Sequence, residues 1–212
     1  MIEAKIRLNH FLKLSLFSLL IVLIFISFSQ KGDTVIFINK LHNPFLDSFF
    51  KYYTFLGSGW IMVFAAAFFL FYQFQMSFLT LIIGAFQTIV TGFFKMIIFP
   101  DAPRPLTFLK DEYPLEMVED VVRLYYRSFP SGHTMTAFSM ATLLALMTNN
   151  KHTQLILFIY AFFIGLSRIY LAHHFLSDVV FGAVFGMLVT FLGIFMNNKL
   201  SFWKNQSLSG KL

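Results

Sequence analysis

His174 and Asp178, four residues apart near the end of the chain, have the types and spacing of a nucleophile and its orienting carboxylate. On a helix, this spacing places two side chains on one face. An aspartate bound to one imidazole nitrogen fixes the tautomer and leaves the other nitrogen free to attack. His173 is five residues from Asp178 and would point elsewhere, so we expect His174 to be the oriented histidine.

A second histidine, His133, could transfer the proton that such an attack requires. One neutral histidine that attacks and one charged histidine that donates form the expected nucleophile and acid pair. His133 follows Ser131 and Gly132 at the start of an apolar segment. A helix that begins there would present free backbone N–H groups to an anion. Gly132 would let the anion approach the backbone, and Ser131 would donate a hydrogen bond, cap the helix, or do both.

Three further bases, Lys95, Arg104 and Arg168, predict an anion site. The planar arginine side chains match the oxygens of a phosphate, and the lysine adds a point charge. Ionisable residues at a membrane edge are costly, so a cluster of them indicates function. Asp178 is the one carboxylate in this cluster, which is therefore cationic.

Simpler interpretations compete with this one. A histidine at a helix end is usually a satisfied polar residue, and we interpret His173 in this way. We interpret His10, His42 and His152 in the same way, since the sequence shows no partners for them. Metal ligation by His133, His174 and Asp178 is disfavoured, because three nearby cations would oppose a divalent ion. We expect no metal and no cofactor.

The composition indicates that these residues belong to a membrane protein. Of the 212 residues, 58% are hydrophobic and 12% are charged, against roughly 25% charged in soluble domains. So few charges cannot cover a surface that faces water. The chain has no cysteine, which excludes disulfides and thiolate metal sites. Its net charge of +6 is not clustered as in nucleic-acid binders, and we expect no nucleic-acid partner.

Six apolar segments predict an all-α, polytopic membrane protein, a bundle of six transmembrane helices in one domain over residues 1–212. A helix needs about 20 apolar residues to cross a bilayer. The first two segments are short and would borrow flanking residues. A cleaved signal peptide is disfavoured for the first, because no small-residue cleavage site follows it. The segments span roughly 14–29, 60–74, 77–98, 132–148, 153–171 and 177–196.

An even number of spans puts both termini on one side of the membrane. The segments on that side then contain seven bases and one acid, Glu3, while the outer segments contain the other nine bases and nine acids, so raw counts of bases do not decide the orientation. The seven bases are Lys5, Arg7, Lys13, Lys151, Lys199, Lys204 and Lys211. Five of the outer bases belong to the predicted site or its loop, and we expect both termini to be cytoplasmic and the site to face outward from a bacterial plasma membrane.

Two outer stretches predict short helices that lie on the membrane. Asn43 can cap a helix that starts at Pro44 and ends at Gly57. Pro114 could open a second helix, with Leu115 and Val122 on its apolar face. Both fit interfacial amphipathic helices, and ordinary loop packing is the alternative.

The motifs resemble those of the type 2 phosphatidic acid phosphatase superfamily, in its membrane lipid phosphatase branch, which is related to the vanadium haloperoxidases. Pro130-Ser131-Gly132-His133 resembles the second motif of the family. Ser167-Arg168, followed by His174 and Asp178, resembles the third, while Lys95 and Arg104-Pro105 resemble the first. The order and separations agree, and the six segments cover nearly the whole chain.

The resemblance implies a phosphohistidine mechanism that needs no metal. His174 would attack phosphorus, Asp178 would orient it, and His133 would protonate the departing oxygen. Lys95, Arg104, Ser131, Gly132 and Arg168 would hold the phosphate. One departure concerns Lys95, because eight residues separate it from Arg104, two more than in the usual motif. The extra residues fall in Pro100–Pro103, which is expected to be a loop that absorbs them at small entropic cost.

Several functions fit these residues. The favoured one is hydrolysis of a lipid phosphate or diphosphate, with undecaprenyl diphosphate, phosphatidylglycerol phosphate, phosphatidic acid and lipid A as candidate substrates. A lipid phosphotransferase would use the same histidine. An anion transporter is disfavoured because the charges gather at one face rather than at mid-bilayer, and a haloperoxidase because those relatives are soluble. The sequence does not define the oligomeric state.

Overall fold

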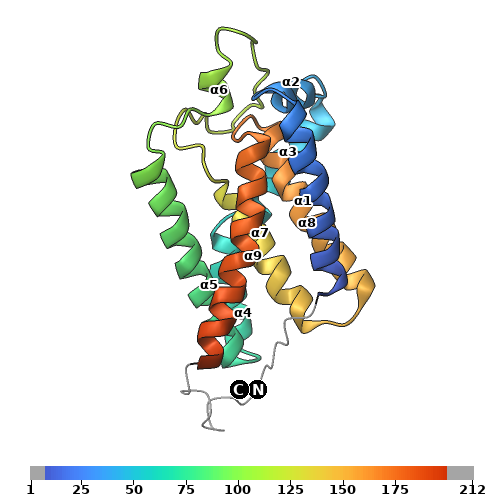
Figure 1. Cartoon of the computed structure of the whole chain (residues 1–212), viewed down its shortest axis with the longest axis vertical. Helices are drawn as coiled ribbons and strands as arrows, with labels where there is room; N and C mark the ends of the chain where they lie inside the picture. The colour runs from blue at the N-terminus through green and yellow to red at the C-terminus, as the bar shows by residue number, and fades with distance from the viewer. Residues whose placement is uncertain (1–7, 200–212) are drawn as a thin grey trace.

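A computed structural model describes residues 8–199, and every regular element in that range is a helix. The long helices lie side by side, and α1 begins at the end of the bundle where α9 ends, while the short α2, α3 and α6 lie at the other end (Figure 1). The elements are α1 (His10–Phe28), α2 (Asp33–Asn39), α3 (Pro44–Tyr53), η1 (Thr54–Gly57), α4 (Trp60–Leu70), α5 (Phe74–Phe93), η2 (Phe94–Ile98), α6 (Pro105–Phe108), α7 (Gly132–Met147), α8 (Lys151–Tyr170) and α9 (Leu176–Lys199).

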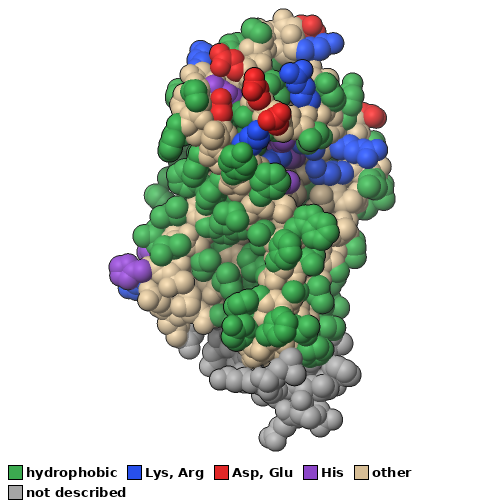
Figure 2. Space-filling model, turned by 180° about the vertical axis from the view of Figure 1, so that it is seen from behind, with side chains coloured by type: hydrophobic (Ala, Val, Ile, Leu, Met, Phe, Trp, Pro, Cys, Tyr) green, Lys and Arg blue, Asp and Glu red, His purple; other side chains and the backbone are tan. Residues whose placement is uncertain are grey.

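The surface of the bundle is arranged as a membrane protein requires. Apolar side chains cover its middle, while most acidic and basic side chains gather at the end that holds α2, α3 and α6 (Figure 2). On α1, Phe17 and Phe28 are 64% and 89% exposed. Apolar area of this extent is unstable in water, so lipid must cover it. The chain is an integral membrane protein, as the composition predicted.

The six predicted helices are present, but their number as membrane spans is not established. Four described helices are long and apolar enough to cross a membrane, namely α1, α5 with η2, α8 and α9. A fifth span is possible if Pro44–Gly57 and Trp60–Leu70, which are bent by 55°, form one broken span. The remaining helix, α7, has 16 residues, a length of about 24 Å against a hydrocarbon core of about 30 Å.

The short α7 lies in the centre of the bundle, with most of its side chains buried. Its closest partner is α9, because two glycines one turn apart let the backbones approach. A Cβ added at Gly182 would lie 2.6 Å from the backbone oxygen of Ser131, and one added at Gly186 would lie 2.5 Å from that of Met135. This small-residue spacing is typical of tightly packed membrane helices. It holds the start of α7 beside the first turn of α9.

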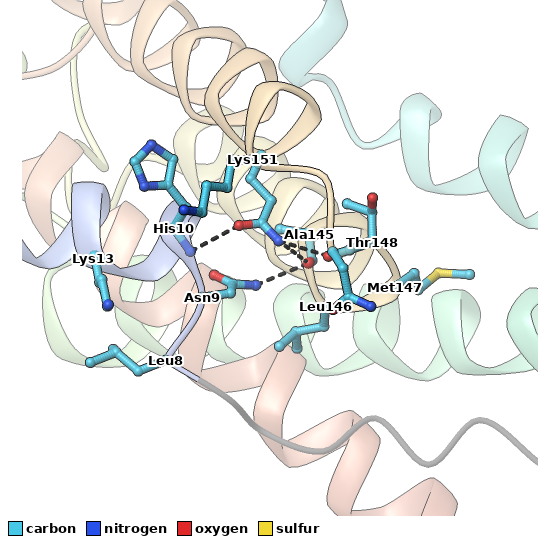
Figure 3. Close-up of a pocket in the computed structure, with 11 residues that line it drawn as sticks. Leu8, Asn9, His10, Lys13, Ala145, Leu146, Met147, Thr148 and Lys151 are labelled. Atoms are coloured by element: carbon cyan, nitrogen blue, oxygen red, sulfur yellow. Dashed lines mark hydrogen bonds between the residues drawn. The ribbon is translucent and has the colours of Figure 1, made fainter.

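At the opposite end of the bundle, α1 is tied to the turn between α7 and α8. Asn9 caps α1 and donates from Nδ2 to the backbone oxygen of Ala145 at 2.9 Å. The side chain of Gln154 accepts from the backbone of His10 and donates to that of Thr148. These contacts line a cavity of about 500 Å³ that contains none of the predicted site residues (Figure 3).

The two predicted interfacial helices have different outcomes. The first is present as α3 and η1, and the Asn43 side chain accepts from the N–H of Leu46 as its cap. The second prediction is wrong, because residues 114–125 form no helix. Backbone groups of this segment form hydrogen bonds with a side chain of α2 instead. Asn39 donates from Nδ2 to Glu116 O at 2.8 Å and accepts at Oδ1 from the N–H of Glu116 at 2.9 Å.

Predictions that concern the two ends of the chain lie outside the described residues. This applies to the orienting bases Lys5, Arg7, Lys204 and Lys211, and to Glu3.

Candidate active site

His174, in the buried connection between α8 and α9, lies beside Asp178 in the first turn of α9. The His174 Nδ1 atom is 3.4 Å from Asp178 Oδ2, without the geometry of a hydrogen bond. Asp178 itself is held firmly, since Oδ2 accepts from the Ser128 hydroxyl at 2.5 Å and from the N–H of Phe175 at 3.0 Å. The carboxylate therefore has a fixed position, with the Nδ1 edge of the imidazole facing it.

The other nitrogen of His174 faces Arg104. Nη1 of Arg104 lies 3.2 Å from His174 Nε2. Since a guanidinium can only donate, Nε2 is the acceptor and Nδ1 carries the proton. The structure thus pairs the protonated nitrogen with a carboxylate and the lone pair of the other nitrogen with a cation.

Arg104 is fixed by backbone carbonyls at the membrane edge. Its Nε donates to Tyr126 O at 2.8 Å, Nη2 to Arg127 O at 3.1 Å and Nη1 to His173 O at 2.7 Å. The residue just before α6 therefore organises the non-helical segment 121–127. Burial lowers the pKa of Arg104 to about 10, so it is charged at neutral pH.

Burial lowers the pKa of His174 well below its ordinary value. The charges of Arg104, Lys95 and Arg168 lower it further, as does His173. The structure therefore brings the three predicted bases within electrostatic range of the predicted nucleophile. A histidine in this field is neutral at physiological pH, which is the form that can attack.

Arg168, at the end of α8, is buried and held by neutral acceptors. Nη1 donates to the hydroxyl of Thr54 in η1, and Nη2 donates to Nδ1 of His173. Its Nε is buried with no hydrogen-bond partner. No carboxylate in residues 8–199 pairs with Arg168, so its charge is available to an anion.

Lys95 lies in η2, a π-helical turn that ends α5. The turn is anchored by aromatic packing, since Phe94 stacks on Phe185 of α9 with ring centroids 5.1 Å apart and also meets Phe129 edge-on at 5.5 Å. The connection from Phe99 to Arg104 is irregular, as expected from the two extra residues. The π turn thus brings Lys95 close enough for its charge to act on His174.

The start of α7 combines a cap with free backbone donors. The Ser131 side chain accepts from the N–H of Thr134 at 3.4 Å and exchanges a hydrogen bond with the Thr134 hydroxyl at 2.9 Å. The N–H of Ser131 donates to Asp178 O at 3.0 Å. Among the described residues, the N–H groups of Gly132 and His133 have no acceptor, so they can bind an anion. Ser131 was predicted to donate a hydrogen bond to an anion, to cap the helix, or to do both, and the structure shows it as the cap of α7.

His133 is half-buried in the first turn of α7, and its ring makes no hydrogen bond within residues 8–199. Both ring nitrogens are therefore without a protein partner in that range. Its role, like those of the other predicted site residues, stays a prediction. No group of three His, Asp or Glu side chains in the described part of the chain is arranged to ligate a metal ion.

Two histidines that were interpreted as satisfied polar residues have partners in the structure. His173 is buried and binds Arg168 through Nδ1 and the backbone oxygen of Val122 through Nε2, at 2.9 Å. His42 has partners, because Nδ1 lies 3.0 Å from Asp47 and the ring stacks on Tyr170 at 4.3 Å. The sequence did not indicate the contacts with Val122 and Tyr170, since these residues lie in separate segments.

Two further residues of the site were missed. Ser128 binds the Asp178 carboxylate, and Thr54 binds Arg168. Ser128 lies 50 residues before its partner and Thr54 lies 114 residues before its own. The position of Ser128, just before Pro130-Ser131-Gly132-His133, was the one signal that could have identified it.

Comparison with known proteins identifies relatives along most of the chain. The model of the PAP2 superfamily matches residues 74–201. LpxE of Aquifex aeolicus has a similar structure, with a TM-score of 0.66 and 33% identity, over 78% of this chain and 95% of that one. The lipid A 4′-phosphatase of Porphyromonas gingivalis is 29% identical over 164 residues, 72% of this chain and 66% of the relative. The lipid A 1-phosphatase of the same organism is 42% identical over 73 residues, 34% of this chain and only 16% of the relative.

Proposed function

This chain belongs to the PAP2 superfamily, and we propose that it is an integral-membrane lipid phosphatase that acts through a phosphohistidine. The observation that carries the proposal is the polarised environment of His174. Its Nδ1 atom lies 3.4 Å from Asp178 Oδ2 and its Nε2 atom lies 3.2 Å from Arg104 Nη1. Nε2 thereby has a lone pair beside a group that can bind phosphate oxygens.

In the proposed reaction, the lone pair of Nε2 forms a bond to phosphorus while the bond from phosphorus to the lipid oxygen breaks. The departing oxygen takes a proton from His133. Arg104 and Arg168, together with the free N–H groups of Gly132 and His133, stabilise the charge on the phosphoryl oxygens. Water then attacks the phosphohistidine, and His133 accepts its proton, so that phosphate leaves and His174 is restored.

The proposal needs no metal, because the cationic groups of the site supply the charge stabilisation. Lys95 contributes a point charge close to His174. Positioning and electrostatics provide most of the catalysis in phosphoryl transfer. Activity in the presence of a chelator is therefore part of the test.

The substrate class is a lipid that carries a phosphate monoester or diphosphate. Two of the relatives are named as lipid A phosphatases, so lipid A comes first among the candidates. Undecaprenyl diphosphate, phosphatidylglycerol phosphate and phosphatidic acid complete the panel. The proposed orientation places the site at the outer face of a bacterial plasma membrane.

The experiment is phosphate release by purified protein from this lipid panel, with EDTA present and His174→Ala beside the wild type. The proposal expects release that survives EDTA and falls at least a thousandfold in the variant, as removal of a nucleophile does. Labelled phosphate found on an acceptor lipid rather than in water would identify a phosphotransferase instead. Turnover at the wild-type rate by a folded His174→Ala protein would refute the mechanism.

A further inference from the structure

His173 contacts both arginines of the cationic site. Its Nδ1 binds Nη2 of Arg168, and its backbone oxygen accepts from Nη1 of Arg104 at 2.7 Å. Its Nε2 lies 2.9 Å from Val122 O. One residue thereby joins the end of α8, the residue before α6 and the segment 121–127.

The partners of His173 define its tautomer. The guanidinium of Arg168 can only donate, so Nδ1 must accept. The proton is then on Nε2, which donates to Val122 O. Burial, followed by the charge of Arg168, lowers the pKa of His173 to about 3. The ring is therefore neutral at any working pH.

Arg168 is held by neutral hydrogen-bond acceptors, which orient its guanidinium without cancelling its charge. A buried arginine needs fixed hydrogen bonds to hold its guanidinium in one orientation. A carboxylate would provide them but would also cancel the charge that attracts an anion. The imidazole of His173 and the hydroxyl of Thr54 orient the guanidinium without adding negative charge. The full positive charge is thus kept for a ligand.

We propose that His173 is a positioning residue for phosphate, which acts through its neutral ring on Arg168 and through its backbone oxygen on Arg104. The proposal rests on the proposed function for its chemistry, but it concerns phosphate affinity and can be tested without turnover. His173, whose ring binds Arg168 and Val122 O rather than Asp178, thereby has a function distinct from that of the adjacent His174.

The test uses three substitutions of His173. His173→Asn places an amide oxygen near the position of Nδ1 and keeps a neutral acceptor for Arg168. His173→Phe keeps the ring volume and removes both polar atoms. His173→Asp places a carboxylate against Arg168. His152→Phe, at an exposed position in the first turn of α8, is the matched control.

The primary measurement is the dissociation constant of inorganic phosphate, by calorimetry on purified protein in detergent. We expect His173→Phe and His173→Asp to weaken phosphate binding at least tenfold, as expected when a charge-assisted contact is lost. We expect His173→Asn to recover most of this loss, and His152→Phe to bind as the wild type does. Where hydrolysis is measurable, kcat/KM should follow the same order.

The outcomes separate this proposal from the proposed function. If phosphate affinity follows the expected order but no lipid is hydrolysed, the positioning role stands and the lipid phosphatase assignment falls. If His173→Phe does not fold, the comparison of His173→Asn with His173→Asp decides, because their side chains have nearly the same size. Equal phosphate affinity in the wild type and His173→Asp would overturn the positioning role.

Discussion

At the scale of single residues, the most informative contact joins Arg104 Nη1 and His174 Nε2 at 3.2 Å. In the proposed mechanism, this hydrogen bond occupies the lone pair that attacks phosphorus. A phosphoryl group that entered the site would take over the donor, and Arg104 would then bind a phosphoryl oxygen instead of His174. The same group can therefore hold His174 in its reactive tautomer before the attack and stabilise charge during it.

The electrostatics of His174 predict the acid side of the pH profile. Its pKa is lowered by burial and then by Arg104, Lys95 and Arg168. Because the neutral form attacks, the rate is retained as the pH falls through 6.5 and declines only well below it. Lys95→Met removes one repelling charge and raises the pKa of His174. The acid limb of the pH profile should therefore shift to higher pH. The measurement is kcat/KM from pH 4.5 to 9, and a wild-type acid limb at or above pH 6.5 would contradict the assignment.

The sequence could predict residues that act within one motif but not those that join distant segments. The spacing predicted that His174 and Asp178 lie together, and the structure places Nδ1 3.4 Å from Oδ2. The reason differs, because His174 lies before α9 and not on the same helix as Asp178. The interpretation of His173 as a satisfied polar residue was incomplete, because nothing in the sequence indicates that Arg168 and Val122 are its partners. The identity of an acceptor for a buried arginine depends on tertiary packing, which spacing does not encode.

At the scale of elements, the contact between α7 and α9 holds the site together. The absence of a side chain at Gly182 lets α9 lie against the backbone of Ser131. At this crossing, the Ser131 N–H donates to Asp178 O at 3.0 Å. Helix packing and the placement of the orienting carboxylate therefore depend on the same few atoms.

Substitution of Gly182 should affect both stability and activity. In Gly182→Ala, the new Cβ would lie 2.6 Å from Ser131 O, so the helices must separate. We expect a loss of about 1–3 kcal/mol and reduced phosphate release. Gly84→Ala in α5 is the control, because its Cβ meets Met62 at an ordinary 3.7 Å. Thermal unfolding in detergent and phosphate release measure the two effects; equal behaviour of both variants would argue against the close contact.

Helices were predictable where apolar runs or caps define them and not where other contacts use the backbone. Asn43 and Pro44 predicted α3 correctly, because a cap and a proline define a helix start locally. The stretch after Pro114 has helical periodicity, yet the backbone oxygen of Glu116 accepts from the Asn39 side chain at 2.8 Å. A helix there would use this carbonyl internally and leave the buried amide of Asn39 without this partner.

At the scale of the whole molecule, most charged side chains on the face shown in Figure 2 gather at one end of an apolar bundle. Arg104, which precedes α6, belongs to this end. In the proposed function, the groups that bind phosphate would lie at the level of the lipid headgroups and the apolar middle would contact the acyl chains. This arrangement suits a substrate whose phosphate is attached to a membrane lipid.

The orientation in the membrane can be measured directly, because the chain contains no cysteine. We expect Asp111→Cys, in the segment before residue 114, to react with an impermeant maleimide added to intact cells. Asn149→Cys, in the turn between α7 and α8, should react only after the membrane is opened. The reverse pattern would mean that the site faces the cytoplasm.

The three carbonyl contacts of Arg104 also have a consequence for protease sensitivity. Segment 121–127 has no regular structure and contains Arg123 and Arg127, both exposed and both trypsin sites. Arg104 holds two of its carbonyls. Arg104→Lys keeps the charge but cannot reach all three carbonyls, so trypsin should cut this segment faster than in the wild type, as judged by gel electrophoresis of timed digests. A cleavage rate equal to that of the wild type would show that the segment is held by other contacts. The digest therefore distinguishes a variant in which segment 121–127 is no longer held in place from one in which only substrate binding is weakened.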